Sequence, residues 1–268
     1  MSGMFIGFLI GGSALALAMI SLFILFLNQE KLIFRPEKIP SNYNFEFQHE
    51  FEELFLEPKR GIRLNAVLFK SKESKGLVLY FHGHRGSIAS WGYVADDIVE
   101  NGWDCLVYDY RSYGKSNGKI ISELSLHRDA QFIYDVMSER YKGKDIILFG
   151  QSLGSGIAAK LATENKIKAL LLVTPYFNFT DVVRFHYPFL PVRFLLKYKL
   201  TTNKSLPQIK VPVYLIHGTK DELIQYESSI RLSSLSDNIQ LTTVNGGLHG
   251  NLQDFEEYQM LLSEILKT

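Results

Sequence analysis

From Gly76 onwards, short apolar runs alternate with longer segments whose apolar residues recur at helical spacing. The runs are "GLVLYFHG", "DCLVYDY", "DIILFG", "ALLLVTPY", "VPVYLIHG" and "IQLTTV". Continuous apolar runs of this kind are typical of parallel strands that are buried on both faces. The alternation predicts an α/β fold with a mostly parallel sheet and helices on both faces, after an antiparallel start in residues 45–56 and 63–69.

The motif "GQSLG" follows one of these runs and precedes a predicted helix over residues 155–162. A catalytic serine in such a turn needs a strand before it, a helix after it, and small neighbours around a strained backbone. Gly150 and Gly154 are the small neighbours of Ser152. A glycine-rich turn that binds phosphate at the helix N-terminus is the alternative, but no Lys-Ser or Lys-Thr pair follows. The context therefore favours Ser152 as a nucleophile.

Polar loops follow four of the predicted strands, at the edge where parallel sheets bind their ligands. The loop "HGHRGS" follows Phe81, "GQSLG" follows Phe149, "HGTKDE" follows Ile216 and "GGLHGN" follows Val244. Four such loops are much harder to obtain by chance than one serine motif. We expect the four loops to converge on one site.

A serine hydroxyl needs a base that accepts its proton. His249 is the favoured base, because the glycines at 247 and 250 free its loop to place the imidazole over Ser152. The other candidates are interpreted as surface, packing or loop-fixing residues: His49, His82, His127, His186 and His217. The pair His82-x-His84 lacks a carboxylate-rich partner motif, so no metal ion is expected.

A carboxylate must orient the base, and it should also lie at a strand end. Asp221 in "HGTKDELI" meets this condition, and its neighbour Glu222 is the alternative. Asp109 also ends a strand, but the nearby Arg111 suggests a structural ion pair. The resulting chain order of serine, aspartate and histidine is the order that the nucleophile-elbow class requires.

Two backbone N–H groups should stabilise the negative charge that develops on the substrate oxygen. Leu153, the residue after the nucleophile, is predicted to provide one of them. His84, in the loop after the "LVLYF" strand, is predicted to provide the other.

The N-terminus differs from the rest of the chain. Residues 4–27 carry no charge and are numerous enough to cross a bilayer as a helix. No basic residue precedes this segment, and a cleavable signal peptide fits poorly. We therefore expect a single transmembrane anchor at residues 4–27, a connector at 28–44, and a hydrolase domain at 45–268.

The anchor also carries weaker signals about its partners and orientation. Gly3, Gly7 and Gly11 lie four residues apart, which allows close helix pairing and a weak homodimer, or merely reflects tolerance of lipid. Basic residues follow the segment at positions 31, 35 and 38. The positive-inside rule then favours a cytoplasmic catalytic domain.

Composition excludes several other functions. The chain has 29 basic and 28 acidic residues, and no basic cluster alternates with aromatic residues, so nucleic acid is not an expected partner. Cys105 is the only cysteine, which excludes an intrachain disulfide and a cysteine-based zinc site. No cofactor is expected.

Five segments together resemble the α/β-hydrolase superfamily: "FHGHRGS", "DYRSYGKSNG", "GQSLGSG", "LIHGTKDELI" and "GGLHGN". Within it they are similar to the Bem46-like group, relatives of the ABHD13, ABHD12 and ABHD17 proteins. The likeness runs from about Lys31 to the C-terminus, and it departs at His84 and Arg85, where relatives often have Asn-Ala. The resemblance implies a serine hydrolase acting on lipid esters or acyl thioesters, and several members have an N-terminal membrane anchor.

Residues 176–206 interrupt the alternation of strands and helices and are predicted to form a small helical cap over the site. The aromatic and basic side chains of this cap are typical of either a membrane contact or ordinary packing. Together with the anchor, the cap favours hydrolysis of a lipid-like acyl ester or thioester through an acyl-enzyme on Ser152. A serine peptidase of the same fold and a non-enzymatic membrane scaffold are the alternatives.

Overall fold

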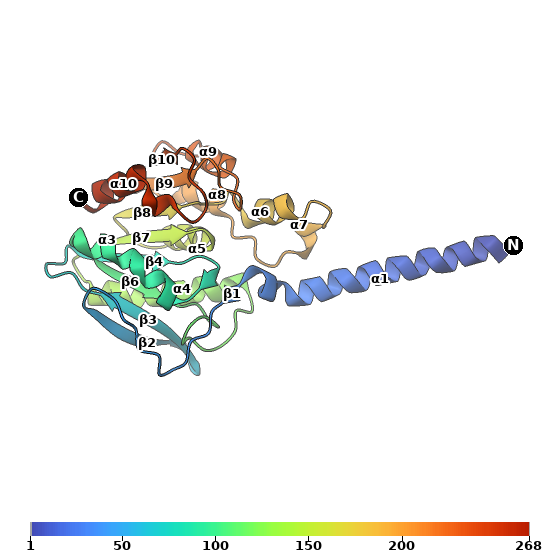
Figure 1. Cartoon of the computed structure of the whole chain (residues 1–268), viewed down its shortest axis with the longest axis horizontal. Coiled ribbons are helices and arrows are strands. Elements are labelled where there is room, and N and C mark those ends of the chain that lie inside the picture. The colour runs from blue at the N-terminus through green and yellow to red at the C-terminus, as the bar shows by residue number, and fades with distance from the viewer. Residues whose placement is uncertain (1, 268) are drawn as a thin grey trace.

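The body of the protein is a sheet covered by helices on both faces, and one long helix projects away from it (Figure 1). This computed structural model describes the backbone of residues 2–267 and the side chains of the same residues except 2–12, 14, 15 and 18. The projecting helix is α1, which begins at Ser2 and ends at Ile33.

The strands are β1 (Arg35–Pro36), β2 (Phe51–Lys59), β3 (Ile62–Phe69), β4 (Gly76–Phe81), β5 (Arg85–Gly86), β6 (Asp104–Tyr108), β7 (Asp145–Gln151), β8 (Ala169–Val173), β9 (Val213–Gly218) and β10 (Ile239–Val244). The α-helices after α1 are α2 (Ile88–Trp91), α3 (Ala95–Glu100), α4 (Glu123–Arg140), α5 (Leu153–Ala162), α6 (Phe179–His186), α7 (Val192–Leu195), α8 (Thr202–Ser205), α9 (Glu227–Ser233) and α10 (Glu256–Lys267). Three short 3₁₀ helices lie at η1 (Gly92–Val94), η2 (Leu206–Gln208) and η3 (Leu252–Asp254).

Eight strands form the main sheet in the order β10-β9-β8-β7-β4-β6-β3-β2. Neighbours from β10 to β6 pair in parallel, whereas β3 pairs antiparallel with both β6 and β2. The predicted α/β-hydrolase architecture, a mostly parallel sheet after an antiparallel start, is therefore confirmed. Strand β2 begins at Phe51 rather than at residue 45, and the chain turns into β3 at Gly61, whose φ of +82° favours glycine.

The central strands are apolar throughout because each of their faces packs against helices. In β4, Leu77, Leu79 and Phe81 face a core cluster that includes side chains of α4, α5 and α9. The alternate residues Val78 and Tyr80 face a second cluster with side chains of α3 and α10. This period of two is that of a pleated strand. Because these strands run parallel, the loops at their carboxyl ends emerge at the same edge of the sheet.

Helix α1 differs from the predicted N-terminal organisation in one respect. It continues to Ile33, so the first residues of the predicted connector at 28–44 are helical. The predicted membrane span at 4–27 lies partly outside the residues whose side chains are described, and Gly3, Gly7 and Gly11 lie wholly outside them. In the part that is described, no helix is both long and apolar enough to cross a bilayer.

Candidate active site

Ser152 lies in a sharp turn between the end of β7 and the start of α5. Its φ of 52° and ψ of −115° are strained for a residue with a side chain. Two glycines allow the turn. A Cβ on Gly154 would lie 2.0 Å from the carbonyl oxygen of Phe81, and one on Gly150 would lie 2.7 Å from that of Gly154. The predicted strand-turn-helix context of the serine is therefore present, together with the steric reason for both glycines.

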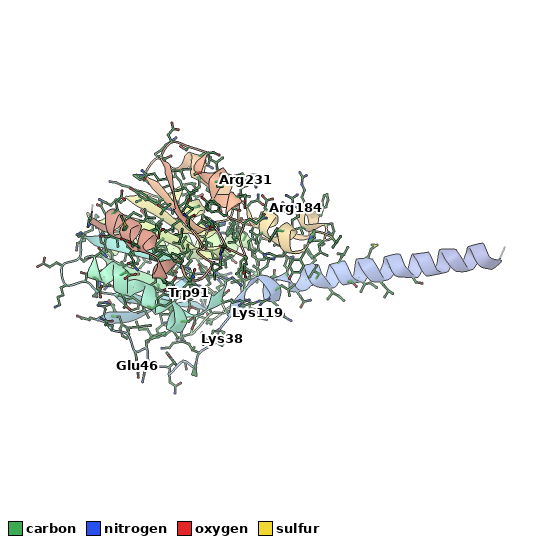
Figure 2. The ribbon with its side chains drawn as sticks, turned by 45° about the horizontal axis from the view of Figure 1, so that its top comes forward. Lys38, Glu46, Trp91, Lys119, Arg184 and Arg231 are labelled. Atoms are coloured by element: carbon green, nitrogen blue, oxygen red, sulfur yellow. The ribbon has the colours of Figure 1, made fainter. Side chains whose placement is uncertain are left out.

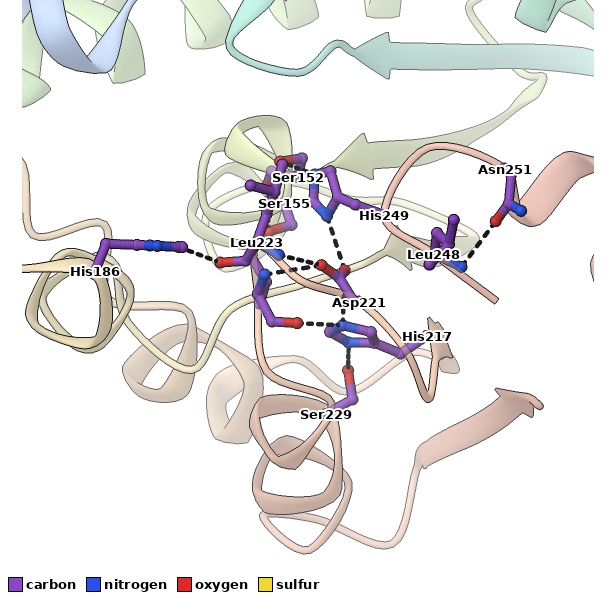
Figure 3. A network of polar contacts seen from close by, with 11 residues as sticks. Ser152, Ser155, His186, His217, Asp221, Leu223, Ser229, Leu248, His249 and Asn251 are labelled. Carbon is purple, nitrogen blue, oxygen red and sulfur yellow. Dashed lines mark hydrogen bonds and ion pairs between the residues drawn. The ribbon is translucent and has the colours of Figure 1, made fainter. Parts of the chain in front are cut away.

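The structure brings Ser152, His249 and Asp221 together from the loops after β7, β10 and β9 (Figure 3). Nε2 of His249 lies 2.9 Å from Oγ of Ser152. Nδ1 of His249 lies 2.8 Å from Oδ2 of Asp221. A carboxylate can only accept a hydrogen bond, so Nδ1 carries the proton and Nε2 is left to accept the serine proton.

The carboxylate of Asp221 is completely buried, and every hydrogen bond to it favours its charged form. Oδ1 accepts the backbone N–H groups of Leu223 at 2.8 Å and Ile224 at 2.9 Å. Burial acts to raise the pKa of Asp221, but hydrogen bonds from His217 and His249 and the charge of His249 hold that pKa well below its usual range. The group is therefore an anion at neutral pH. Glu222, the alternative acid, is exposed.

His217 is a functional neighbour that sequence reasoning treated only as a loop-fixing residue. Its Nε2 lies 3.1 Å from Oδ2 of Asp221 and 3.0 Å from the carbonyl oxygen of Ile224. Both partners are acceptors, so Nε2 carries the proton and Nδ1 accepts from the Ser229 hydroxyl at 2.7 Å. His217 thus helps to fix the carboxylate of Asp221. The sequence signal for this role was the position of His217, near the end of β9 and four residues before Asp221.

The two predicted oxyanion donors, Leu153 and His84, both line the same cavity as Ser152. Neither of their backbone N–H groups donates a hydrogen bond within the described part of the chain. The carbonyl of His84 is held by the N–H of Arg35 at 2.9 Å and by the hydroxyl of Tyr113 at 2.7 Å. These contacts fix the peptide between His84 and Arg85. The N–H of His84 lies in the preceding peptide, whose carbonyl, that of Gly83, lies 2.7 Å from Nδ1 of His82. Two N–H groups beside a nucleophile, without a partner among the described residues, match what an oxyanion hole requires.

A cavity of about 460 Å³ opens at Ser152. Its apolar walls come from the predicted cap, through α6 and α7, and from the last turns of α1. The side-chain amide of Gln29 on α1 donates to the carbonyl of Leu195 at 3.2 Å and accepts from the N–H of Lys197 at 2.8 Å. Helix α1 is therefore tied to the cap and forms part of the site, which the sequence did not predict.

The remaining candidates lie outside this constellation. Arg111 pairs with Asp129 at 2.7 Å, so the predicted ion pair with Asp109 was wrong. Both carboxylate oxygens of Asp129, on α4, accept from the Arg111 guanidinium. Asp109 instead accepts the N–H of Ile88 at 3.0 Å. His186 lies in the cap, where Nε2 donates to the carbonyl of Leu223 at 2.9 Å. No cluster suited to a metal ion occurs among the described residues.

Comparison with known proteins finds a family profile and several relatives that match this chain. A family profile described as "Serine aminopeptidase, S33" matches residues 72–197. Protein bem46 of Schizosaccharomyces pombe is 29% identical over 247 residues, which cover 84% of this chain and 80% of that protein. Lysophosphatidylserine lipase ABHD12 of Danio rerio is 24% identical over 249 residues, which cover 78% of this chain and 63% of that protein.

Solved structures share the fold. An esterase of Pyrococcus furiosus, Pf2001, has a TM-score of 0.69 at 20% identity, covering 88% of this chain and 97% of its own. Est1E of Butyrivibrio proteoclasticus, solved with ferulic acid, has a TM-score of 0.64 at 23% identity, covering 80% and 96%. The chain has the α/β-hydrolase fold and is similar in sequence to members of that superfamily. Its site contains the nucleophile, base and acid of a serine hydrolase.

His82, in the loop that carries the second oxyanion donor, makes stability depend on pH. Its side chain is fully buried, and Nδ1 donates to the carbonyl of Gly83 at 2.7 Å. Nε2 has no hydrogen-bond partner within the described residues and lies 3.7 Å from Oδ1 of Asp109. Burial lowers the pKa of His82 to about 4 from the usual 6.5. Between these values the unfolded chain binds more protons than the folded one, so the stabilisation is complete above pH 6.5 and is lost as the pH falls towards 4.

We expect the free energy of unfolding to fall by about 3 kcal/mol between pH 7 and pH 4 through His82 alone. The variant His82→Gln removes the titrating group and should flatten the pH dependence by about that amount, even where it lowers stability at pH 7. Urea denaturation of both proteins at several values between pH 7 and pH 4 measures the difference. Parallel curves for the two proteins would contradict this assignment.

Proposed function

We propose that the protein is a serine hydrolase that cleaves carboxylic esters or thioesters of lipid-like substrates through an acyl-enzyme. The observation that carries the proposal is the hydrogen-bonded series from Ser152 through His249 to Asp221, placed at the end of an apolar cavity. No cofactor takes part in this chemistry.

The geometry supports a two-step mechanism. Oγ of Ser152 attacks the substrate carbonyl carbon while Nε2 of His249 accepts its proton. The N–H groups of Leu153 and His84 stabilise the oxyanion, and Asp221 stabilises the imidazolium. Protonated His249 then donates its proton to the leaving alcohol or thiol as the carbon–oxygen or carbon–sulfur bond breaks. Water activated by the same imidazole hydrolyses the acyl-enzyme and restores the serine.

The lining of the cavity favours an ester with an apolar acyl chain over a peptide. The cavity contains no aspartate or glutamate among the described residues that line it, whereas an aminopeptidase has to bind a positively charged α-amine. Its walls are mainly leucine, valine, isoleucine and phenylalanine side chains. The Pyrococcus furiosus neighbour, described as an esterase, and the relative named as a lysophosphatidylserine lipase support the same choice.

We also propose that α1 anchors the protein in a membrane as a single pass. Leu17, Ile20 and Phe23 each leave more than half of their surface exposed, although they are large and apolar. The cap side chains Phe189 and Phe194 are 99% and 86% exposed. Apolar surface of this extent favours a lipid environment. The basic residues that follow residue 27 favour a cytoplasmic catalytic domain, and helix pairing through the N-terminal glycines stays a prediction.

A fluorophosphonate probe tests the activated serine. We expect the native protein to be labelled, Ser152→Ala to lose labelling completely, and Asp221→Asn to react about 10⁴-fold more slowly because His249 would adopt the wrong tautomer. Labelling rates are followed by gel fluorescence, and circular dichroism verifies that each variant is folded. If the folded native protein is neither labelled nor able to hydrolyse any acyl ester, the scaffold alternative replaces this proposal.

The cap should determine the length of the acyl chain that the cavity accepts. Leu190 lines the cavity, whereas its neighbour Phe189 points to solvent. The variant Leu190→Trp fills part of the cavity and should lower kcat/KM for long-chain p-nitrophenyl esters about tenfold or more, with little effect on the acetate ester. Phe189→Trp serves as the matched control and should leave the chain-length profile unchanged. An unchanged profile for Leu190→Trp would place the acyl chain elsewhere.

Membrane insertion through α1 is tested with the full chain. We expect the protein to stay with membranes after extraction with alkaline carbonate, and the double variant Leu17→Arg, Ile20→Arg to be released, because two charges at the centre of a span oppose insertion. Circular dichroism of the released protein establishes that it remains folded. Release of the unchanged protein into the soluble fraction would rule out a spanning anchor.

A further inference from the structure

Two arginines lie side by side at the polar end of the cavity. Strands β1 and β5 pair in parallel with Arg35 directly opposite Arg85. Residues in register on neighbouring strands point to the same face of a sheet, so their side chains are neighbours. Both residues also line the cavity that contains Ser152. The fold therefore brings together two guanidinium groups from positions fifty residues apart.

Neither guanidinium has a counter-charge. Within the described residues, no carboxylate forms an ion pair with Arg35 or with Arg85. Elsewhere arginines do find such partners: Arg184 and Arg231, labelled in Figure 2, share the carboxylate of Asp181 at 2.9 and 3.2 Å. Two like charges placed opposite each other in a sheet repel, so this pair lowers stability unless an anion lies between them.

The charges also lie close to the reacting groups. Burial, and then electrostatic repulsion by Arg85, by His249 in its protonated form and by Arg35, lowers the pKa of His84 to about 4. His84 is therefore neutral at pH 7, and the positive charge at this end of the cavity belongs to the two arginines. Arg85 directly follows His84, the predicted oxyanion donor, so the two charges lie beside the oxyanion loop. The apolar walls of α1 and the cap suit the acyl chain, which leaves this charged part of the cavity to the alcohol part of the substrate.

We propose that Arg35 and Arg85 form an anion-binding subsite for the alcohol part of the substrate, so that the preferred substrate is a single-chain acyl ester with a phosphate or carboxylate next to the ester. This inference rests on the proposed function, since it names the substrate class of the same site. A guanidinium binds either anion through paired hydrogen bonds, and the apolar walls formed by α1 and the cap hold the acyl chain. Occupation of the subsite adds no covalent step to the mechanism.

The test compares two esters with the same acyl chain, a 1-acylglycerol and its 3-phosphate, in neutral detergent with the full chain. We expect kcat/KM for the phosphate ester to exceed that for the neutral ester at least tenfold. Arg35→Gln and Arg85→Gln should each lower the ratio about tenfold, as is typical for a charged hydrogen bond, and Arg85→Lys should restore part of it. An acyl ester of a hydroxy acid distinguishes carboxylate from phosphate as the preferred anion.

Arg128→Gln is the matched control, because Arg128 is exposed on α4, lies outside the cavity and has no ion pair among the described residues. It should leave the ratio unchanged. Equal losses for both esters in the Arg35→Gln and Arg85→Gln variants, or a wild-type preference for the neutral ester, would overturn the subsite. Weaker binding of these variants to anionic vesicles, with an unchanged ratio, would assign the pair to a membrane headgroup and also overturn it.

A binding measurement separates this inference from the proposed function. Octyl phosphate should bind the Ser152→Ala variant in calorimetry, and the added changes Arg35→Gln and Arg85→Gln should weaken binding about tenfold each. If octyl phosphate binds in this way but no ester is hydrolysed, the subsite stands and the proposed function fails. If the neutral ester is hydrolysed and octyl phosphate binding does not depend on the arginines, only the subsite fails.

Discussion

The site depends on the close approach of Gly154 to the end of strand β4. The space for a Cβ at Gly154 is occupied by the carbonyl of Phe81, so the first turn of α5 rests directly on the neighbouring strand. That contact holds Ser152 at a positive φ, which costs about 1–3 kcal/mol and persists only where the surrounding packing enforces it. The oxyanion loop begins at the residue after Phe81. One backbone contact therefore sets the position of the nucleophile relative to an oxyanion donor.

The oxyanion loop is also held from its other side, by the segment that follows α1. Only Phe34 separates the end of α1 from β1, and Phe34 is buried with its ring 5.0 Å from that of Tyr198. Strand β1 then pairs with β5 through hydrogen bonds to the carbonyls of His84 and Gly86. The orientation of α1 is thus coupled to the loop that would stabilise the oxyanion. A displacement of α1 would therefore move the cavity wall and the oxyanion loop together.

The sequence was informative where the signals were local. Apolar runs, glycines and the rule that parallel strands present their loops at one edge were enough to predict the sheet and the order Ser152, Asp221 and His249. The end of α1 was missed because composition turns polar at Asn28, although glutamine, glutamate and lysine are good helix formers that extend the helix to Ile33. Composition marks where apolar character ends, and it does not mark where a helix ends.

The pairing of Arg35 with Arg85 shows a different limit of prediction from sequence. It depends on the register of two strands of two residues each, and strands so short have no periodic pattern from which a register can be read. The partner of Arg111 was also not predictable from the sequence, because Asp109 is near it along the chain but Asp129 is its partner in space. Ion pairs are decided by tertiary packing, so charge proximity along the chain is weak evidence for them.

Under the proposed function, the distribution of charge and apolar surface imposes one orientation on a substrate. The apolar walls belong to α1 and the cap, whereas the polar groups belong to the loops at the sheet edge. An acyl chain that followed the exposed apolar residues of α1 into the cavity would reach Ser152 with its carbonyl and leave its alcohol part beside the two arginines. The helix that would hold the protein at a bilayer would then also guide the substrate, because the same side chains favour lipid and acyl chain alike.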